Sequence, residues 1–202
     1  MQALLKLSSA IDWLNEHIGR WSIWLILAST LISATNAIVR KIFNVSSNAY
    51  LEVQWYLFAA SFLIAAAYTL LHNEHVRIDV VAGRFTRRTQ AKMEAFGFAF
   101  MLLPVCLAVL YFSWPFVVNG YVTKEMSGNS GGLIRWPVYA TIPVGFSLLL
   151  LQCVSEFIKR IAFVSGRIED PGIKRDTKTA EEELADSIRR LAEGKATDAG
   201  AR

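Results

Sequence analysis

Residues 52–79 read EVQWYLFAASFLIAAAYTLLHNEHVRID, and this stretch decides the fold. Residues 53–71 contain no charged side chain. At ~1.5 Å rise per residue, a run of about 19 residues is long enough to cross a ~30 Å hydrocarbon layer. Polar side chains stand at both ends of this run: Glu52 and Gln54 with Trp55 at its start, and His72, Glu74, His75, Arg77 and Asp79 after it. We therefore predict a membrane-spanning helix that is anchored at both ends.

The composition extends this prediction to the whole chain. Of the 202 residues, 53% are hydrophobic and 19% are charged, which is too apolar for an ordinary soluble domain and indicates several spans. The length suits one bundle with tails. The net charge is +4, but the basic residues collect at the ends of apolar runs and form no basic face with aromatics, so no nucleic-acid partner is expected. Cys106 and Cys153 lie inside apolar runs and are expected to be buried thiols.

Four apolar runs predict four transmembrane helices, at about residues 21–39, 53–71, 95–118 and 136–158. Pro104 should kink the third, because proline removes one backbone donor. The predicted fold is an all-α membrane protein, with a transmembrane domain over residues 20–164. Within the first two spans, small residues stand four apart and plausibly mark packing faces. These rows are Ser29, Ser33 and Ala37, and Ser61, Ala65 and Thr69.

The two terminal segments differ from the spans. In residues 1–19, Leu4, Leu7, Ile11, Leu14 and Ile18 fall on one helical face, which favours an amphipathic helix lying in the membrane interface. An extra stretch of ordinary packed helix remains the alternative. Residues 165–202 form a polar tail that we expect to be partly disordered, with a short charged helix possible over 179–191.

Lysine and arginine counts predict the orientation. Ten of these residues lie at the N-terminus, in the middle loop and after the fourth span, against four in the other two loops. Both termini should therefore be cytoplasmic. Tryptophans agree, since Trp21 and Trp24 would lie at the inner interface and Trp55, Trp114 and Trp136 at the outer one.

Little in the sequence indicates chemistry. The HNEH tetrapeptide at 72–75 has histidines three apart, whereas a helical zinc pair needs them four apart, so no metal site is expected. No histidine lies in mid-span to bind haem, and no charged residue lies at a span centre, as a self-sufficient ion-coupled carrier usually requires. The loop SGNSGG lacks the lysine of a phosphate-binding loop. We therefore expect no catalytic residue and no cofactor.

Glu52 and Arg135 are the two charged residues that invite a functional interpretation. A carboxylate at the start of a helix is favoured by the helix dipole, and an arginine at a span end commonly snorkels to the interface. The functional alternative is contact with a partner chain or with lipid headgroups. The whole pattern suggests an accessory subunit whose chemistry lies in another chain.

Six short motifs together resemble the small membrane subunit (DctQ-like) of tripartite ATP-independent periplasmic (TRAP) transporters. The resemblance covers about residues 10–160 and does not include the tail. The motifs are E-x-Q-W at 52–55, A-A-Y-T-L at 66–70, H-V-R-I-D-V at 75–80, S-W-P-F at 113–116, G-G-L at 131–133 and R-W-P at 135–137.

The resemblance implies partners and a role. In that family a periplasmic binding protein delivers an organic acid to a large, many-helix membrane subunit, which carries the substrate and sodium sites. The four-helix small subunit steadies the large one in the bacterial inner membrane. By analogy, a set of polar and aromatic residues becomes candidate contacts with the large subunit or with lipid: Glu52, Gln54, Trp55, His75, Arg77, Asp79, Arg135 and Trp136. The alternatives are a self-contained small carrier and the membrane anchor of a redox enzyme.

Overall fold

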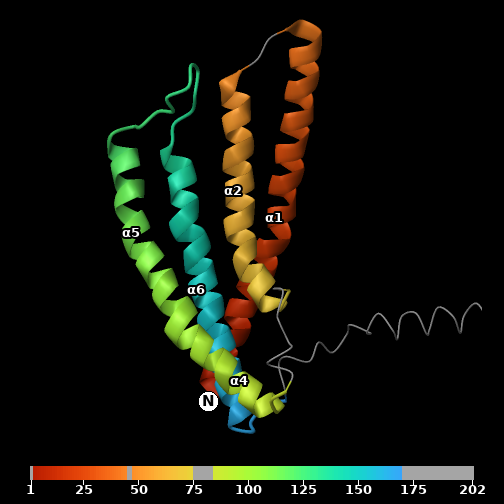
Figure 1. Cartoon of the computed structure of the whole chain (residues 1–202), viewed down its shortest axis with the longest axis vertical. Helices are drawn as coiled ribbons and strands as arrows, with labels where there is room; N and C mark the ends of the chain where they lie inside the picture. The colour runs from red at the N-terminus through yellow and green to blue at the C-terminus, as the bar shows by residue number, and fades with distance from the viewer. Residues whose placement is uncertain (1, 45–46, 75–83, 170–202) are drawn as a thin grey trace, which may run out of the picture. The chain divides into compact units, whose positions relative to one another are not determined.

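The computed structural model describes residues 2–44, 47–74 and 84–169, and its regular elements there are helices. Four helical stretches are long and apolar enough to cross a membrane, which confirms the predicted all-α fold with four spans. The expected helix at 179–191 lies outside the described residues. Figure 1 shows the elements: α1 (Gln2–Phe43), α2 (Asn48–Leu71), α4 (Arg87–Gly97), the π-helix η1 (Phe98–Leu102), α5 (Leu103–Val122) and α6 (Trp136–Val164).

Helix α1 is one continuous helix of 42 residues. At ~1.5 Å per residue it is about 63 Å long, roughly twice the hydrocarbon thickness. Residues 2–19 are thus helical as predicted, but they extend the first span without a break. Their buried side combines polar Ser8 and Asn15 with Ile11 and Gly19, whereas Leu4 and Leu7 are exposed. The location of this segment in the interface stays a prediction.

Helix α6 is the centre of the bundle. Within the described residues it contacts α1, α2, α4, η1 and α5. Helix α2 also packs on α1, so that α5, α6, α2 and α1 follow one another across the bundle (Figure 1). The side of α5 that faces α6 is a narrow stripe of Cys106, Ser113 and Gly120, seven residues apart, which is the spacing of a helix seam. Cys106 and Cys153 are both buried, as predicted.

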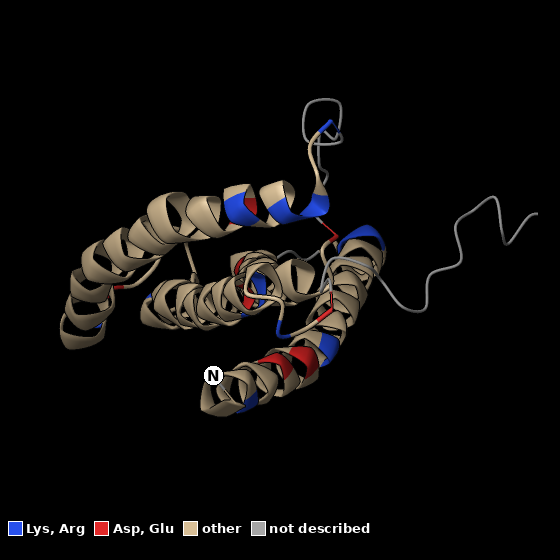
Figure 2. Ribbon diagram, turned by 90° about the horizontal axis from the view of Figure 1, so that it is seen from below, with Lys and Arg blue, Asp and Glu red and all other residues tan. Residues whose placement is uncertain are grey.

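The third span is part of a longer helix that runs through α4, η1 and α5. The π-turn comes directly before Pro104, and the Leu103 amide donates to the Phe98 carbonyl five residues earlier. A proline in a helix frees a carbonyl and crowds the preceding turn, and a wider π-turn accommodates this change. The Cys153 thiol donates to the Phe98 carbonyl at 3.4 Å. Figure 2 shows the resulting helix as a curved rod.

The small-residue rows take part in α1–α2 packing only at some positions. Ser61 is buried and its hydroxyl donates to the Ser22 carbonyl at 3.3 Å, while the Ser29 hydroxyl donates to the Gln54 carbonyl at 3.2 Å. Ser33, by contrast, is exposed, as is Ala37. The row on α1 therefore forms a packing face at its beginning and diverges from α2 farther on.

Gly145 provides a test of the α2–α6 contact. A Cβ added there would lie 2.8 Å from the Leu63 carbonyl oxygen, which belongs to backbone and cannot move aside. We expect Gly145→Ala to lower the free energy of unfolding in detergent by about 1–3 kcal/mol, the usual cost of overpacking. Gly97→Ala is the matched control, since a Cβ there meets nothing within 4 Å. Equal stability of the two variants would show that the helices do not pack this closely.

Candidate functional site

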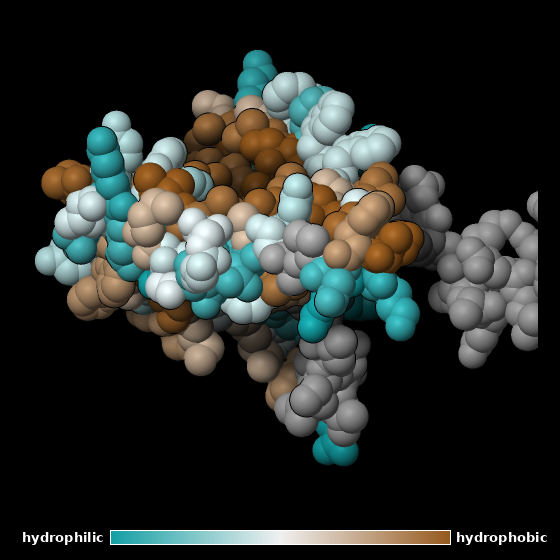
Figure 3. All heavy atoms as spheres, turned by 90° about the horizontal axis from the view of Figure 1, so that it is seen from above, coloured by the Kyte–Doolittle hydropathy of each residue, from teal (hydrophilic) through white to brown (hydrophobic). Residues whose placement is uncertain are grey.

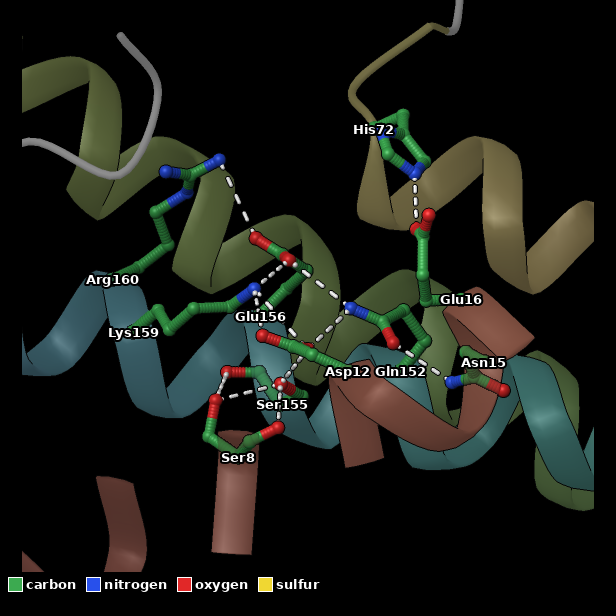
Figure 4. Close-up of polar contacts among 10 residues, drawn as sticks. All are labelled: Ser8, Asp12, Asn15, Glu16, His72, Gln152, Ser155, Glu156, Lys159 and Arg160. Atoms are coloured by element: carbon green, nitrogen blue, oxygen red, sulfur yellow. Dashed lines mark hydrogen bonds and ion pairs between the residues drawn. The ribbon is translucent and has the colours of Figure 1, made fainter. Parts of the chain in front are cut away.

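A group of polar residues joins the N-terminal part of α1 to the C-terminal part of α6 (Figure 4). Six of its members are at most 3% exposed. We call this group the polar cluster: Ser8, Asp12, Asn15, Gln152, Ser155, Glu156, Lys159 and Arg160. The α6 members recur at spacings of three and four, so they lie on one face of that helix.

The Asp12 carboxylate is the main acceptor of the polar cluster. It accepts from the Ser155 hydroxyl at 2.6 Å and from Gln152 Nε2 at 3.0 Å, and its second oxygen lies 3.1 Å from Lys159 Nζ. All three donors come from α6. One side chain of α1 therefore sets the register of α1 along about two turns of α6.

Neutral groups complete the contact. Asn15 Nδ2 donates to Gln152 Oε1 at 2.7 Å, and Gln152 Nε2 also donates to Glu156 Oε1 at 3.2 Å. The hydroxyls of Ser8 and Ser155 are 2.7 Å apart. Side-chain hydrogen bonds of this kind hold transmembrane helices together, where lipid provides no hydrophobic drive for association.

Arg160 connects the polar cluster to α4. Its side chain is 1% exposed, and its Nε lies 2.6 Å from the Glu94 carboxylate of α4, while Nη2 lies 3.6 Å from Glu156. Lys159 also forms an ion pair with Glu156. A buried charge is tolerated only when it is paired. Lys159 has carboxylates on α1 and α6, and Arg160 has carboxylates on α4 and α6. The cluster thus joins three helices, α1, α4 and α6.

A second polar link lies beside the cluster, between α1 and the end of α2. His72 Nε2 is 2.5 Å from Glu16 Oε2, and Arg20 Nη2 is 2.6 Å from Glu16 Oε1. His72 is the C-cap residue of α2, where a polar side chain was expected. Its contact with Glu16 joins the end of α2 to α1, as Figure 4 shows.

The opposite end of the bundle is organised around Glu52, which is 3% exposed. Its carboxylate accepts from the Leu133 amide at 2.6 Å, from Asn129 Nδ2 at 2.8 Å and from the Ser127 hydroxyl. All three donors belong to the loop 123–135 between α5 and α6, which we call the α5–α6 loop. Gly131 allows the loop to turn with a φ of 71°, a conformation that glycine adopts readily.

Arg135 closes the α5–α6 loop at the start of α6. Its guanidinium lies 3.2 Å from Glu125 Oε1, and the Tyr139 hydroxyl donates to the same oxygen at 3.1 Å. Hydrogen bonding with Tyr139 and Glu125 raises the pKa of Arg135 above its usual value, so the guanidinium stays charged. Figure 3 looks onto this end of the bundle, where hydrophobic side chains remain exposed beside hydrophilic ones.

The structure thus brings some of the residues selected from sequence together. Glu52 and Arg135 both hold the α5–α6 loop, and Trp136 packs edge-on against Tyr121 of α5, with ring centroids 5.5 Å apart. Gln54 is half-buried, whereas Trp55 is 66% exposed. The other three lie outside the described residues: His75, Arg77 and Asp79. Whether any of these residues contacts a partner or lipid stays a prediction.

Sequence reasoning missed the polar cluster. Its members were seen only as the polar ends of apolar runs, where contact with water is the ordinary expectation. One available signal was the recurrence of Gln152, Ser155, Glu156 and Lys159 on one helical face. A second was the row of Ser8, Asp12 and Asn15, which flanks the apolar side of the N-terminal helix.

These features define a class: a multi-span membrane protein whose charged groups lie at the two ends of an apolar bundle. The family model of tripartite ATP-independent periplasmic transporters, DctQ component, matches residues 29–163, more than half of the chain, and the chain belongs to this family. No curated protein and no solved structure matches it significantly. The resemblance is thereby confirmed. The family works in a tripartite TRAP system with the other components, so this chain is a transport protein rather than an enzyme.

Arg160 tests the structural role of the polar cluster. Arg160→Met removes the buried cation that pairs with both Glu94 and Glu156, so we expect the free energy of unfolding in detergent to fall by about 3–5 kcal/mol. The control is Arg20→Met, because the Arg20 side chain is 71% exposed and its pair with Glu16 should be worth less than ~1 kcal/mol. A loss at Arg160 no larger than that at Arg20 would contradict the role of the cluster.

Proposed function

We propose that this chain is the small permease subunit of a sodium-coupled TRAP importer for an organic acid or a related solute, and that it scaffolds the large transport subunit. Family membership supports the transporter class. One observation supports placing the solute and sodium sites in the large subunit and not in this chain. No charged side chain occurs in residues 21–39, 53–71, 95–122 or 136–155. A pathway for an anion and sodium needs polar or ionisable groups inside the membrane. These sites therefore belong to the larger partner.

The surface of the bundle supports a scaffolding role. Large hydrophobic side chains cover its outside, and α5 buries only the stripe that faces α6. Such a surface suits lipid or the helices of a partner. The candidate contacts with the large subunit or lipid are again Glu52, Gln54, Trp55, His75, Arg77, Asp79, Arg135 and Trp136. Glu52 is buried, so it would act by holding the α5–α6 loop in the shape that a partner meets.

We further propose an orientation with both termini in the cytoplasm of a bacterial cell and the α5–α6 loop in the periplasm, near the binding protein. The excess of lysine and arginine at the end that holds the N-terminus supports it. In this orientation the first part of α1 lies at the cytoplasmic interface. Its exposed side carries Leu4, Leu7 and Trp13, while Ser8 and Asn15 face α6. An apolar outer side is what an interfacial environment favours.

The proposed function is tested by purifying this chain from native membranes in mild detergent. We expect it to bring down one large multi-span subunit. In liposomes, uptake of an organic acid should require both subunits, the binding protein and a sodium gradient. Recovery of the chain without any large partner, or uptake by this chain alone, would contradict the proposal. A haem absorption band in the purified chain would instead favour the redox-anchor alternative.

Glu52 links the α5–α6 loop to assembly. Glu52→Ala removes the acceptor of three loop donors. We expect recovery of the complex, and with it uptake, to fall by roughly a factor of five or more, because assembly requires the ordered loop. The control is Glu125→Ala on the same loop, whose side chain is partly exposed and pairs only with Arg135 and Tyr139 at the loop's end. A changed substrate preference with assembly intact would show that Glu52 acts on the solute instead.

A further inference from the structure

Helix α4 has two chemically different sides. Ala91 and Ala95 are buried, and Glu94 pairs with Arg160 of the polar cluster, so this side faces α6. The other side is exposed and follows a four-residue spacing that begins just before the helix and continues into η1. We call this line the α4 ridge: Arg84, Arg88, Lys92, Phe96 and Phe100. Residues four apart on a helix form a continuous ridge on its surface.

The α4 ridge changes from basic to aromatic along its length. Phe96 and Phe100 are 61% and 68% exposed, and their rings stack with centroids 4.7 Å apart. The three cations before them are exposed as well. Beyond the ridge the helix continues as α5, whose residues 103–122 are uncharged. The order of cations, then aromatic rings, then an apolar span matches the order of headgroups, interface and acyl chains in a bilayer.

The cations of α4 lack compensating carboxylates. In the part of the chain that the structure describes, no ion pair includes Arg84, Arg88 or Lys92, and neighbouring Arg87 donates to the neutral Gln90 side chain at 3.2 Å. Glu94, the carboxylate of α4, is turned toward Arg160. Figure 2 shows the basic residues gathered at the end of the curved rod that begins with α4, while the rest of the rod is uncharged.

We propose that the α4 ridge is a binding site for acidic phospholipid, with Arg84, Arg88 and Lys92 on the phosphate and Phe96 and Phe100 beside the upper acyl chains. Basic residues at the membrane surface attract anionic headgroups electrostatically. An acidic protein segment could match the cations, but it would leave the stacked phenylalanines without an apolar partner. A lipid satisfies both parts of the ridge at once.

The site also has a consequence for the bundle. Helix α4 is joined to the polar cluster by the pair of Glu94 with Arg160, so a lipid on the outer side of α4 would hold the helix from the side opposite that pair. A ligand that binds only the folded bundle stabilises it by an amount that grows with the logarithm of the ligand concentration relative to its Kd. Acidic lipid should therefore raise the thermal stability of the protein as well as bind to it.

The test compares phosphatidylglycerol with phosphatidylcholine on the purified full-length chain, by native mass spectrometry and by thermal unfolding. We expect phosphatidylglycerol to bind and to raise the unfolding midpoint, and phosphatidylcholine to do neither. Arg88→Gln with Lys92→Gln should weaken phosphatidylglycerol binding roughly tenfold or more, because two cations are lost. Phe96→Ala with Phe100→Ala should weaken it too, while Arg88→Lys with Lys92→Arg should retain it.

The matched control is Arg40→Gln with Lys41→Gln, which removes two adjacent exposed cations from the end of α1. It should bind phosphatidylglycerol as the native chain does. An equal loss in this control would mean a general effect of charge and would overturn the site. Unchanged binding in the Arg88→Gln/Lys92→Gln variant would also overturn it. So would equally tight binding of soluble glycerol phosphate, which would indicate an anion site without a role for lipid.

Discussion

The structure depends on the pairing of buried charges where α1, α4 and α6 meet. Arg160, Glu156 and Gln152 are almost inaccessible, so each must find its partner within the bundle. Asp12 of α1 accepts from Gln152, and Glu94 of α4 pairs with Arg160. Glu156 is paired within α6, by Lys159 and Arg160. Lipid tails are as apolar as leucine and do not drive helices together, whereas hydrogen bonds between helices have direction and therefore select one register. This requirement explains why α6, which carries most of these groups, lies at the centre.

Buried polar groups elsewhere in the bundle also need partners within it, and other side chains supply them there. At the opposite end a single carboxylate, Glu52, is satisfied by a backbone amide and two loop side chains. Between the two ends, small residues such as Ser61 and Gly145 let helices approach closely, and serine hydroxyls satisfy backbone carbonyls of the neighbouring helix. The bundle is therefore polar inside at its two ends and apolar on its outside, which inverts the arrangement of a soluble protein.

The sequence was sufficient to predict the four spans, because a charge-free run of about 19 residues has few other stable solutions. It was insufficient for the join between the N-terminal helix and the first span: both were predicted, but α1 runs through them without a break, since polar residues that pair with α6 do not interrupt a helix. Glu52 was selected from sequence, but its partners lie in a glycine-containing loop more than 70 positions later. Asp12 and Ser155 were missed because their pairing spans 143 positions. Such pairings follow from tertiary packing, which no local pattern reports.

The polar cluster extends beyond the region that the family model matches. The matched region, residues 29–163, contains the polar face of α6 but not the part of α1 that pairs with it. Without Asp12 and Asn15, Gln152 and Ser155 would be buried with few partners, at a cost of about 1–3 kcal/mol for each unsatisfied group. The first turns of α1 are therefore required by the chemistry of α6, in the same sense that the α5–α6 loop is required by Glu52. The polar groups of α1 and α6 are thus paired with one another at one end of the bundle, and large hydrophobic side chains are exposed along its outside.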